Sequence, residues 1–191
     1  HNTWTQPDDF RHFNDYFTAL GYLLAESREE ARVAVIHPLH AAYLTFNRHD
    51  PHSCDGLNQA FVALIERLGA AQIGHHYVDE TLLAQHVGKL DDGKLRVGQC
   101  TYDYVIVPEM DTLDASTAAI LKRYLANGGK LWLAGKAPHL IDGETGDLRF
   151  LRANVRFEDM LNPRCRADRL DTPVRSTYRH SAFGDFLFAV N

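Results

Sequence analysis

The fold is decided by three short apolar runs: R-V-A-V-I at residues 32–36, Y-V-I-V at residues 104–107 and K-L-W-L-A at residues 130–134. Short, nearly continuous runs of this kind are typical of strands that a parallel sheet buries on both faces. A proline or a glycine follows each run within two residues. Both residue types end strands, so we expect each run to be one complete strand.

Helical patterns alternate with these runs. Apolar residues recur at helical spacing after Asp55, Asp79 and Asp114, and each of these aspartates is a residue type that caps helices. Residues 72–77 predict a further strand, and residues 94–97 predict a short strand or a hairpin arm. Such alternation favours a parallel sheet with helices on both faces. We therefore expect an α/β fold, a flavodoxin-like doubly wound sheet of about four to five strands within residues 30–146.

The two ends of the chain differ from this core. Residues 10–24 predict a helix whose apolar residues, Phe10, Phe13, Phe17, Leu20 and Leu24, share one face. We interpret residues 1–29 as a helical lead-in from a preceding domain. Residues 147–191 contain eight arginines and no lysine, and they end in a strand-like run. We interpret them as a linker and a trailing β-hairpin that begins a following β domain.

Composition limits the possible functions. The 191 residues carry a net charge of −5, which argues against nucleic-acid binding, and no apolar run is long enough to cross a membrane. Cys54, Cys100 and Cys165 are odd in number and far apart, which is typical of reduced structural thiols. We expect a soluble protein whose compartment the sequence leaves open, with the cytoplasm favoured.

In open α/β sheets, ligands bind beyond the carboxyl ends of the strands. His37, Glu109 and Lys136 follow three of the predicted strands there, and together they offer a base, an acid and a cation. The alternative is that they are ordinary loop residues. The loop after the first strand contains no glycine, so neither dinucleotide-binding nor P-loop chemistry is predicted, and we expect no cofactor.

Histidines concentrate in the segment after the first strand, which we interpret as a loop. The possible metal ligands there are His37, His40, His49, His52 and Cys54. Zinc sites prefer imidazole and thiolate, but two H-x-x-H pairs converge well only on a regular element. Polar loop histidines are therefore the favoured interpretation, and we predict no metal site.

Class I glutamine amidotransferases share this general architecture and carry a nucleophilic cysteine on a tight turn after a strand. The corresponding turn is L-A-G-K-A at residues 133–137. It contains no Cys, Ser or Thr, so covalent catalysis of that type is unavailable. We assign no catalytic residue.

The order of segments resembles an interior part of large glycoside hydrolases of the α-L-rhamnosidase-like kind. The matching stretches are D-Y-F at residues 15–17, A-R-V-A-V-I-H-P at 31–38, L-R-V-G at 95–98, Y-D-Y-V-I-V-P at 102–108, K-L-W-L-A-G at 130–135 and D-F-L-F-A-V-N at 185–191. The α/β part is also similar to the trimerisation domain of β-galactosidases. The resemblance implies a non-catalytic accessory domain between a catalytic barrel and a β-sandwich, with the catalytic carboxylates elsewhere.

Such a domain braces its neighbours, and its partners would be the flanking domains, a second copy of the chain or carbohydrate. Two alternatives stay open. One is a stand-alone module that binds sugar or metal through the segment from His37 to Cys54. The other is a small hydrolase or amidotransferase-like enzyme that uses His37 and Glu109.

Overall fold

The computed structural model describes residues 7–90, 92–161 and 175–190. Cys165 and the first six residues of the predicted lead-in lie outside these ranges. In chain order the elements are α1 (Pro7–Ala25), β1 (Ser27–Glu29), β2 (Val33–Ile36), α2 (Leu39–Thr45), α3 (Asp55–Ala70), β3 (His75–Val78), α4 (Glu80–His86), β4 (Leu95–Val97), β5 (Cys100–Tyr102), β6 (Tyr104–Pro108), β7 (Thr112–Leu113), α5 (Ala115–Ala126), β8 (Lys130–Ala134), β9 (Leu140–Ile141), β10 (Glu144–Thr145), the 3₁₀ turn η2 (Phe157–Met160), β11 (Arg175–Ser181) and β12 (Gly184–Val190).

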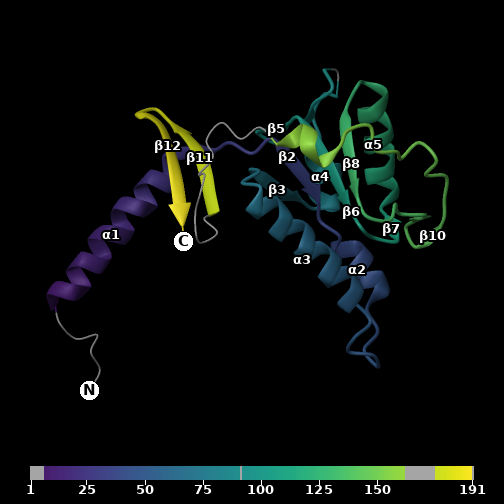
Figure 1. Ribbon diagram of the computed structural model, residues 1–191, viewed down its shortest axis with the longest axis horizontal. Helices are drawn as coiled ribbons and strands as arrows, with labels where there is room; N and C mark the ends of the chain where they lie inside the picture. The colour runs from purple at the N-terminus through teal and green to yellow at the C-terminus, as the bar shows by residue number, and fades with distance from the viewer. Residues whose placement is uncertain (1–6, 91, 162–174, 191) are drawn as a thin grey trace.

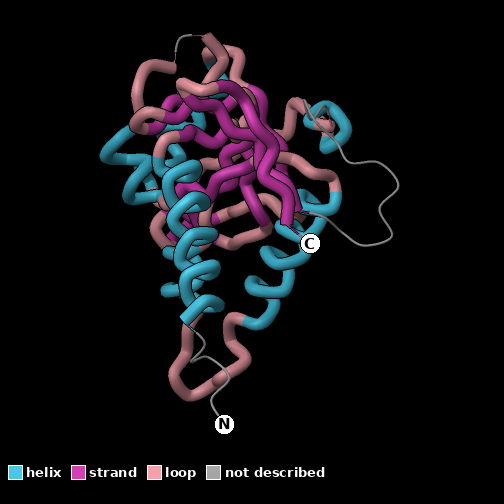
Figure 2. Tube along the Cα trace, turned by 90° about the vertical axis from the view of Figure 1, so that its left-hand side faces the viewer, coloured by secondary structure: helices cyan, strands magenta, loops and turns pink. Residues whose placement is uncertain are grey.

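The core of the fold is a parallel sheet with strand order β3-β2-β6-β8. β2 lies in the middle, where Val33 pairs with His75 of β3 on one side and with Tyr104 of β6 on the other. This confirms the predicted α/β fold with a doubly wound parallel sheet and a leading helix. Figure 2 shows strands in the middle of the view, those of the trailing hairpin in front where the chain ends at C, with helices on either side.

The two faces of the sheet pack against different helices, because successive side chains of a strand point to opposite faces. On one face, Val33, Val35 and Ile106 pack with Leu64 and Leu68 of α3. The residues on the opposite face, which pack with α4 and α5, include Ala34, Ile36, Val105, Val107, Leu83, Ile120 and Leu121. All residues of β2 and β6 are buried, which explains why their sequences are nearly continuous apolar runs.

Local sequence signals place most helix ends. The Asp79 carboxylate accepts hydrogen bonds from the amides of Thr81 and Leu82 and so caps α4, as predicted. Asp55 lies inside the first turn of α3 rather than at its cap, which is Cys54. The predicted arm at residues 94–97 is β4, which forms an antiparallel hairpin with β5.

The segment after β8 also packs on the sheet. Leu148 and Leu151 join the face that carries α4 and α5, and Phe157 and Met160 join the face that carries α3. The small sheet with strand order β10-β9-β7 was not predicted. The division of the chain at residue 146 stays a prediction.

The leading helix runs into a second sheet, which contains the trailing hairpin. β1 follows α1 and pairs antiparallel with β11, which pairs with β12. The predicted trailing hairpin is thus confirmed, and β1 extends it to three strands. Figure 1 shows α1, β11 and β12 to one side of the four-stranded sheet. No helix in the described ranges combines the length and the apolar character that crossing a membrane requires.

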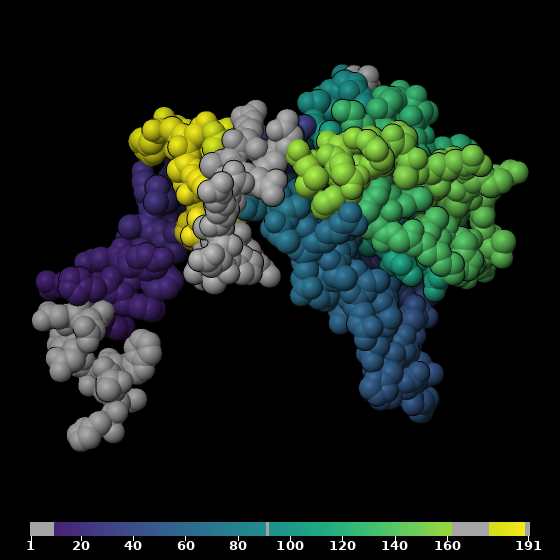
Figure 3. Space-filling view, in the orientation of Figure 1, coloured from purple at the N-terminus to yellow at the C-terminus, as the bar shows by residue number. Residues whose placement is uncertain are grey.

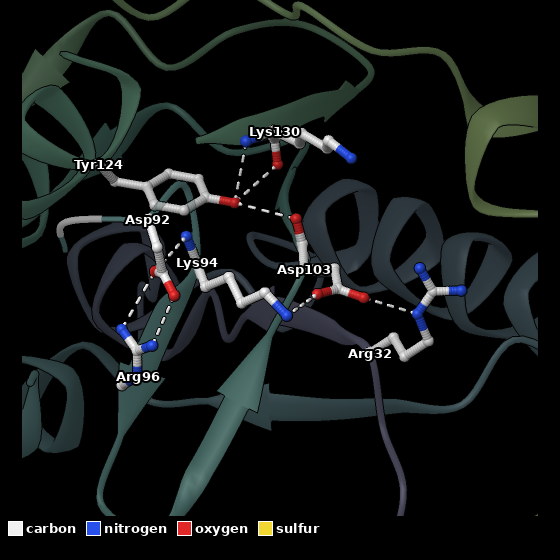
Figure 4. A network of polar contacts seen from close by, with 7 residues as sticks. All are labelled: Arg32, Asp92, Lys94, Arg96, Asp103, Tyr124 and Lys130. Atoms are coloured by element: carbon white, nitrogen blue, oxygen red, sulfur yellow. Dashed lines mark hydrogen bonds and ion pairs between the residues drawn. The ribbon is translucent and has the colours of Figure 1, made fainter. Parts of the chain in front are cut away.

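A polar network ties the amino ends of the strands together (Figure 4). The Asp103 carboxylate accepts hydrogen bonds from Arg32 at 2.7 Å and from Lys94 at 3.1 Å. The Tyr124 hydroxyl accepts the Lys130 amide at 3.0 Å and lies 3.3 Å from the Asp103 carbonyl oxygen. Burial alone would raise the pKa of Asp103, but the bonds from Arg32 and Lys94 outweigh it and hold that pKa below its ordinary value.

We expect Asp103→Asn to lower the free energy of unfolding at pH 7 by about 1–2 kcal/mol, because two hydrogen bonds lose their charged acceptor. Since the pKa of Asp103 is lowered on folding, its contribution is present above the unfolded-chain pKa of about 4 and is lost as the pH falls below it. Urea unfolding at pH 7 and pH 3 tests this, and the difference between variant and wild type should shrink at pH 3.

Asp92→Asn is the matched control, because Asp92 pairs with Arg96 in an exposed position of the same network. We expect it to have a smaller effect than Asp103→Asn at pH 7. An equal loss at both pH values for Asp103→Asn would contradict a charge-based role.

Candidate functional site

Glu109 and Lys136 lie together at the carboxyl ends of β6 and β8. The Lys136 amide donates to Glu109 Oε2 at 3.4 Å, and its ammonium group lies 3.8 Å from Asp111. The turn between β8 and Lys136 depends on Gly135, which has a φ of +126°. A Cβ there would lie 2.3 Å from Glu109 Oε2, so the Glu109 carboxylate occupies the space that a side chain would need.

His37 faces a different neighbourhood. Its ring packs edge-on against Phe61 of α3 and stacks near Tyr77 of β3. Among the described residues, no hydrogen bond or ion pair joins His37 to Glu109 or Lys136. The structure therefore joins Glu109 and Lys136 by a hydrogen bond, whereas the contacts of His37 are with the aromatic rings of α3 and β3.

A second group at the same edge of the sheet is more compact. It consists of His40 in the first turn of α2, Glu80 in the first turn of α4, and Asp114 just before α5. Each of these three residues offers one ligand atom, and those atoms all lie within 4.8 Å of one another. The residues follow β2, β3 and β6, which are neighbours in the sheet. We call this group the carboxyl-edge cluster.

Two short contacts hold the carboxyl-edge cluster. His40 Nδ1 lies 2.6 Å from Asp114 Oδ2, and the Asp114 amide donates to Glu80 Oε2 at 2.9 Å. Burial alone would lower the pKa of His40, but the Asp114 carboxylate outweighs it, so that the pKa of His40 is raised above its ordinary value. The side chains of His40 and Asp114 are 31% and 25% exposed, which leaves this side of the cluster open to solvent.

Glu80 forms the closed side of the cluster. It is 1% exposed, and its Oε1 atom has no hydrogen-bond partner among the described residues. Burial raises the pKa of Glu80, while the Asp114 amide and the nearby Thr117 hydroxyl oppose this. Within the part of the chain that the structure describes, Thr117 Oγ1 also has no partner within hydrogen-bonding geometry. A buried carboxyl oxygen without a partner is unfavourable unless a proton or a cation compensates it.

Asp114 is available to the cluster because another residue replaces it as a cap. Its side chain makes no hydrogen bond to the first turn of α5, contrary to the capping role that its position predicted. Asp142 Oδ1 accepts the Ala115 amide at 2.9 Å instead. Asp142 has a φ of +51° and reaches the helix from the β9–β10 turn. The Asp114 carboxylate is therefore free to face His40.

The remaining histidines of the predicted metal-binding segment lie elsewhere. His52 pairs with Asp55 at 2.7 Å in an exposed position, and His49 Nε2 accepts Arg48 at 2.9 Å. The Cys54 thiol lies 3.6 Å from the Ala42 carbonyl oxygen. Part of the segment is the helix α2 and not a loop, which corrects that expectation. Because α2 fixes the direction of His40, His40 meets carboxylates from other loops rather than its neighbours in sequence.

A cavity of about 350 Å³ lies between α2 and α3. Its lining includes His37, Leu39, Cys54 and Phe61. This volume lies within the range of small-molecule sites in proteins. The lining of the cavity includes several residues of the segment from His37 to Cys54.

Sequence reasoning missed the carboxyl-edge cluster although it named His40. A signal was present, since one acidic or imidazole side chain follows each of three neighbouring strands within about six residues. Glu80 and Asp114 lie at helix starts, where acidic residues are common, so their positions did not by themselves indicate a site.

We expect Gly135→Ala to lower the free energy of unfolding by at least about 1–3 kcal/mol, because alanine disfavours this φ and its Cβ would displace Glu109. Gly69→Ala in α3 is the control, since a Cβ there meets no atom within 4 Å and helical glycine is disfavoured by up to about 1 kcal/mol. Thermal unfolding should show a lower midpoint for the first variant and an equal or higher one for the second. A wild-type midpoint for Gly135→Ala would show that the turn is unconstrained.

Comparison of the chain with protein-family models, with curated proteins and with solved structures found no match.

Proposed function

We propose that the chain is a non-catalytic α/β accessory domain of a multidomain glycoside hydrolase, which braces a catalytic barrel against a β-sandwich. The proposal rests on the resemblance of its segments to α-L-rhamnosidase-like enzymes and on one structural observation. That observation is an aromatic helix face, exposed to solvent and rigidly attached to the trailing hairpin. Catalytic carboxylates would belong to the barrel and not to this domain.

The exposed face belongs to α1. Phe10, Phe13 and Phe17 are 61%, 48% and 50% exposed, and the rings of Phe13 and Phe17 lie 4.5 Å apart. Tyr16 packs edge-on against Phe17 and is also exposed. Figure 3 shows α1 projecting from the rest of the molecule. A contiguous apolar patch on a helix is typical of a surface that another domain or subunit covers.

Arg179 of β11 fixes the end of this helix. Its guanidinium donates to the carbonyl oxygens of Leu24 and Ser27, each at 3.1 Å, and to the Ser27 hydroxyl at 2.8 Å. It also lies 3.4 Å from the Glu29 carboxylate, and its side chain is only 13% exposed. An arginine with this many acceptors holds two elements in one relative orientation. The α1 face is therefore presented in a fixed direction relative to β11.

This arrangement suits a bracing role. A helix that enters from one neighbour and a hairpin that leads to another would meet at Arg179 and β1, beside the α/β sheet. Domains that transmit position between neighbours need such rigid junctions, because flexible linkers permit independent motion. The junction is thus the part of the structure that best supports the proposal.

The cavity between α2 and α3 supports a related role in carbohydrate contact. His37 and Phe61 form part of its wall. A bracing domain at the edge of a sugar cleft would contribute such a surface. The competing hypothesis of an enzyme that uses His37 and Glu109 has less support, because the two side chains have separate contacts.

We expect the chain to self-associate through α1, since this face is exposed to water when no neighbouring domain covers it. The triple variant Phe10→Ser, Phe13→Ser and Phe17→Ser should sediment as a monomer at concentrations where the wild type associates. The double variant Tyr43→Ser and Phe46→Ser, which alters exposed rings outside α1, should associate like the wild type. A wild type that is monomeric at all concentrations would contradict this use of α1.

We also expect the gene to encode a barrel with paired Asp or Glu residues before this segment and a β-sandwich after it. Sequencing the reading frame on both sides tests this directly. The isolated chain should hydrolyse no aryl glycoside. A reading frame that contains neither domain, or glycosidase activity from the isolated chain, would overturn the proposal.

A further inference from the structure

The carboxyl-edge cluster has features that a bracing role does not require. His40, Glu80 and Asp114 come from three separate loops, and their ligand atoms converge within 4.8 Å. The cluster lies where β2 is flanked by β3 and β6. The connection after β2 runs to β3 on one side and the connection after β6 runs to β8 on the other, so the strand order reverses between β2 and β6, which is where open α/β sheets place their ligands.

No lysine or arginine in the described ranges balances the carboxylates of the cluster. Within the described ranges, no lysine or arginine forms an ion pair with Glu80 or Asp114, and His40 is the only basic partner of Asp114 there. Glu80 is 1% exposed and keeps Oε1 without a partner. A buried carboxylate next to a second carboxylate is unfavourable unless a positive charge lies between them. A bound cation would supply that charge.

We propose that His40, Glu80 and Asp114 bind one divalent first-row transition-metal ion, with Zn²⁺ as the preferred occupant. The ion replaces the proton between His40 Nδ1 and Asp114 Oδ2. These atoms now lie 2.6 Å apart, and tetrahedral coordination at about 2.1 Å requires a separation of about 3.4 Å. A small rotation of the two side chains, which are partly exposed, provides the difference.

The surrounding contacts orient the ligands for this role. The Asp114 amide holds Glu80 Oε2 and so fixes the orientation of the carboxylate, whose Oε1 has no hydrogen-bond partner among the described residues. The Thr81 hydroxyl lies 3.4 Å from His40 Nε2, so the imidazole can donate its second N–H there while Nδ1 binds the metal. Histidine ligands commonly donate their other N–H in this way, which fixes the orientation of the ring.

The donor set selects the kind of ion. One imidazole nitrogen and two carboxylates suit Zn²⁺, and the two negative charges neutralise its charge. Mg²⁺ and Ca²⁺ prefer sites made of oxygen atoms only. Three protein ligands leave a fourth position toward the exposed side of His40 and Asp114, where water or a ligand oxygen can bind.

Calorimetric titration of the metal-free chain with ZnCl₂ tests the proposal. We expect saturable binding of one equivalent that Glu80→Gln, Asp114→Asn and His40→Ala each weaken at least about tenfold. The control is His52→Ala, which removes the exposed His52–Asp55 pair with its similar 2.7 Å contact but no buried third carboxylate. This control should bind like the wild type. Mg²⁺ and Ca²⁺ should bind far more weakly.

Two measurements distinguish the loss of a metal ligand from misfolding of the variant. Glu80→Gln keeps an acceptor for the Asp114 amide, and circular dichroism of the metal-free variants should match the wild type. Titration with Co²⁺ should give visible absorption bands of low-coordinate cobalt in the wild type that are lost in folded Asp114→Asn. Failure to bind up to about 1 mM Zn²⁺, or equal binding by folded variants and wild type, would overturn the proposal. Neither result depends on the accessory-domain role.

Discussion

The pairing of β2 with both β3 and β6 is the constraint on which the rest of the structure depends. Because β2 is central, each of its side chains is buried against a helix on one face or the other. The same pairing sets the carboxyl ends of three strands side by side, and so it brings His40, Glu80 and Asp114 within reach of one another. The pairing of β2 with its two neighbours thus determines both the packing of the core and the position of the carboxyl-edge cluster.

The opposite ends of the strands have a different character. There, Arg32, Lys94 and Asp103 form ion pairs, and the Tyr124 hydroxyl meets the backbone of Lys130 (Figure 4). Arg32, Lys94 and Asp103 each have a partner of opposite sign, which is typical of a structural network. The carboxyl-edge cluster instead places two carboxyl groups beside one imidazole, and no lysine or arginine is ion-paired with them among the described residues. This contrast distinguishes the amino ends of the strands, whose contacts are structural, from the carboxyl ends, where we propose a ligand site.

Sequence patterns predicted the sheet well because its central strands are buried on both faces, which forces a continuous apolar composition. The two-residue strands β7, β9 and β10 were not predicted, since such short pairings leave no periodicity. The candidate site was only partly predictable. His40 was named for its neighbours in sequence, whereas its partners depend on helix α2 and on Asp142 replacing Asp114 as a cap. Neither of these two features has a local signal.

The pairing of β1 with β11 has a consequence for the order of folding. Ser27 and Arg179 bond across a separation of 152 residues. Closing an unstructured loop of that length costs roughly 4 kcal/mol of chain entropy. Once the four-stranded sheet has formed, most of the intervening chain is already ordered, and this closure becomes much less unfavourable. We therefore expect the three-stranded sheet to form late, so that the direction in which α1 points is set only after the α/β core is complete.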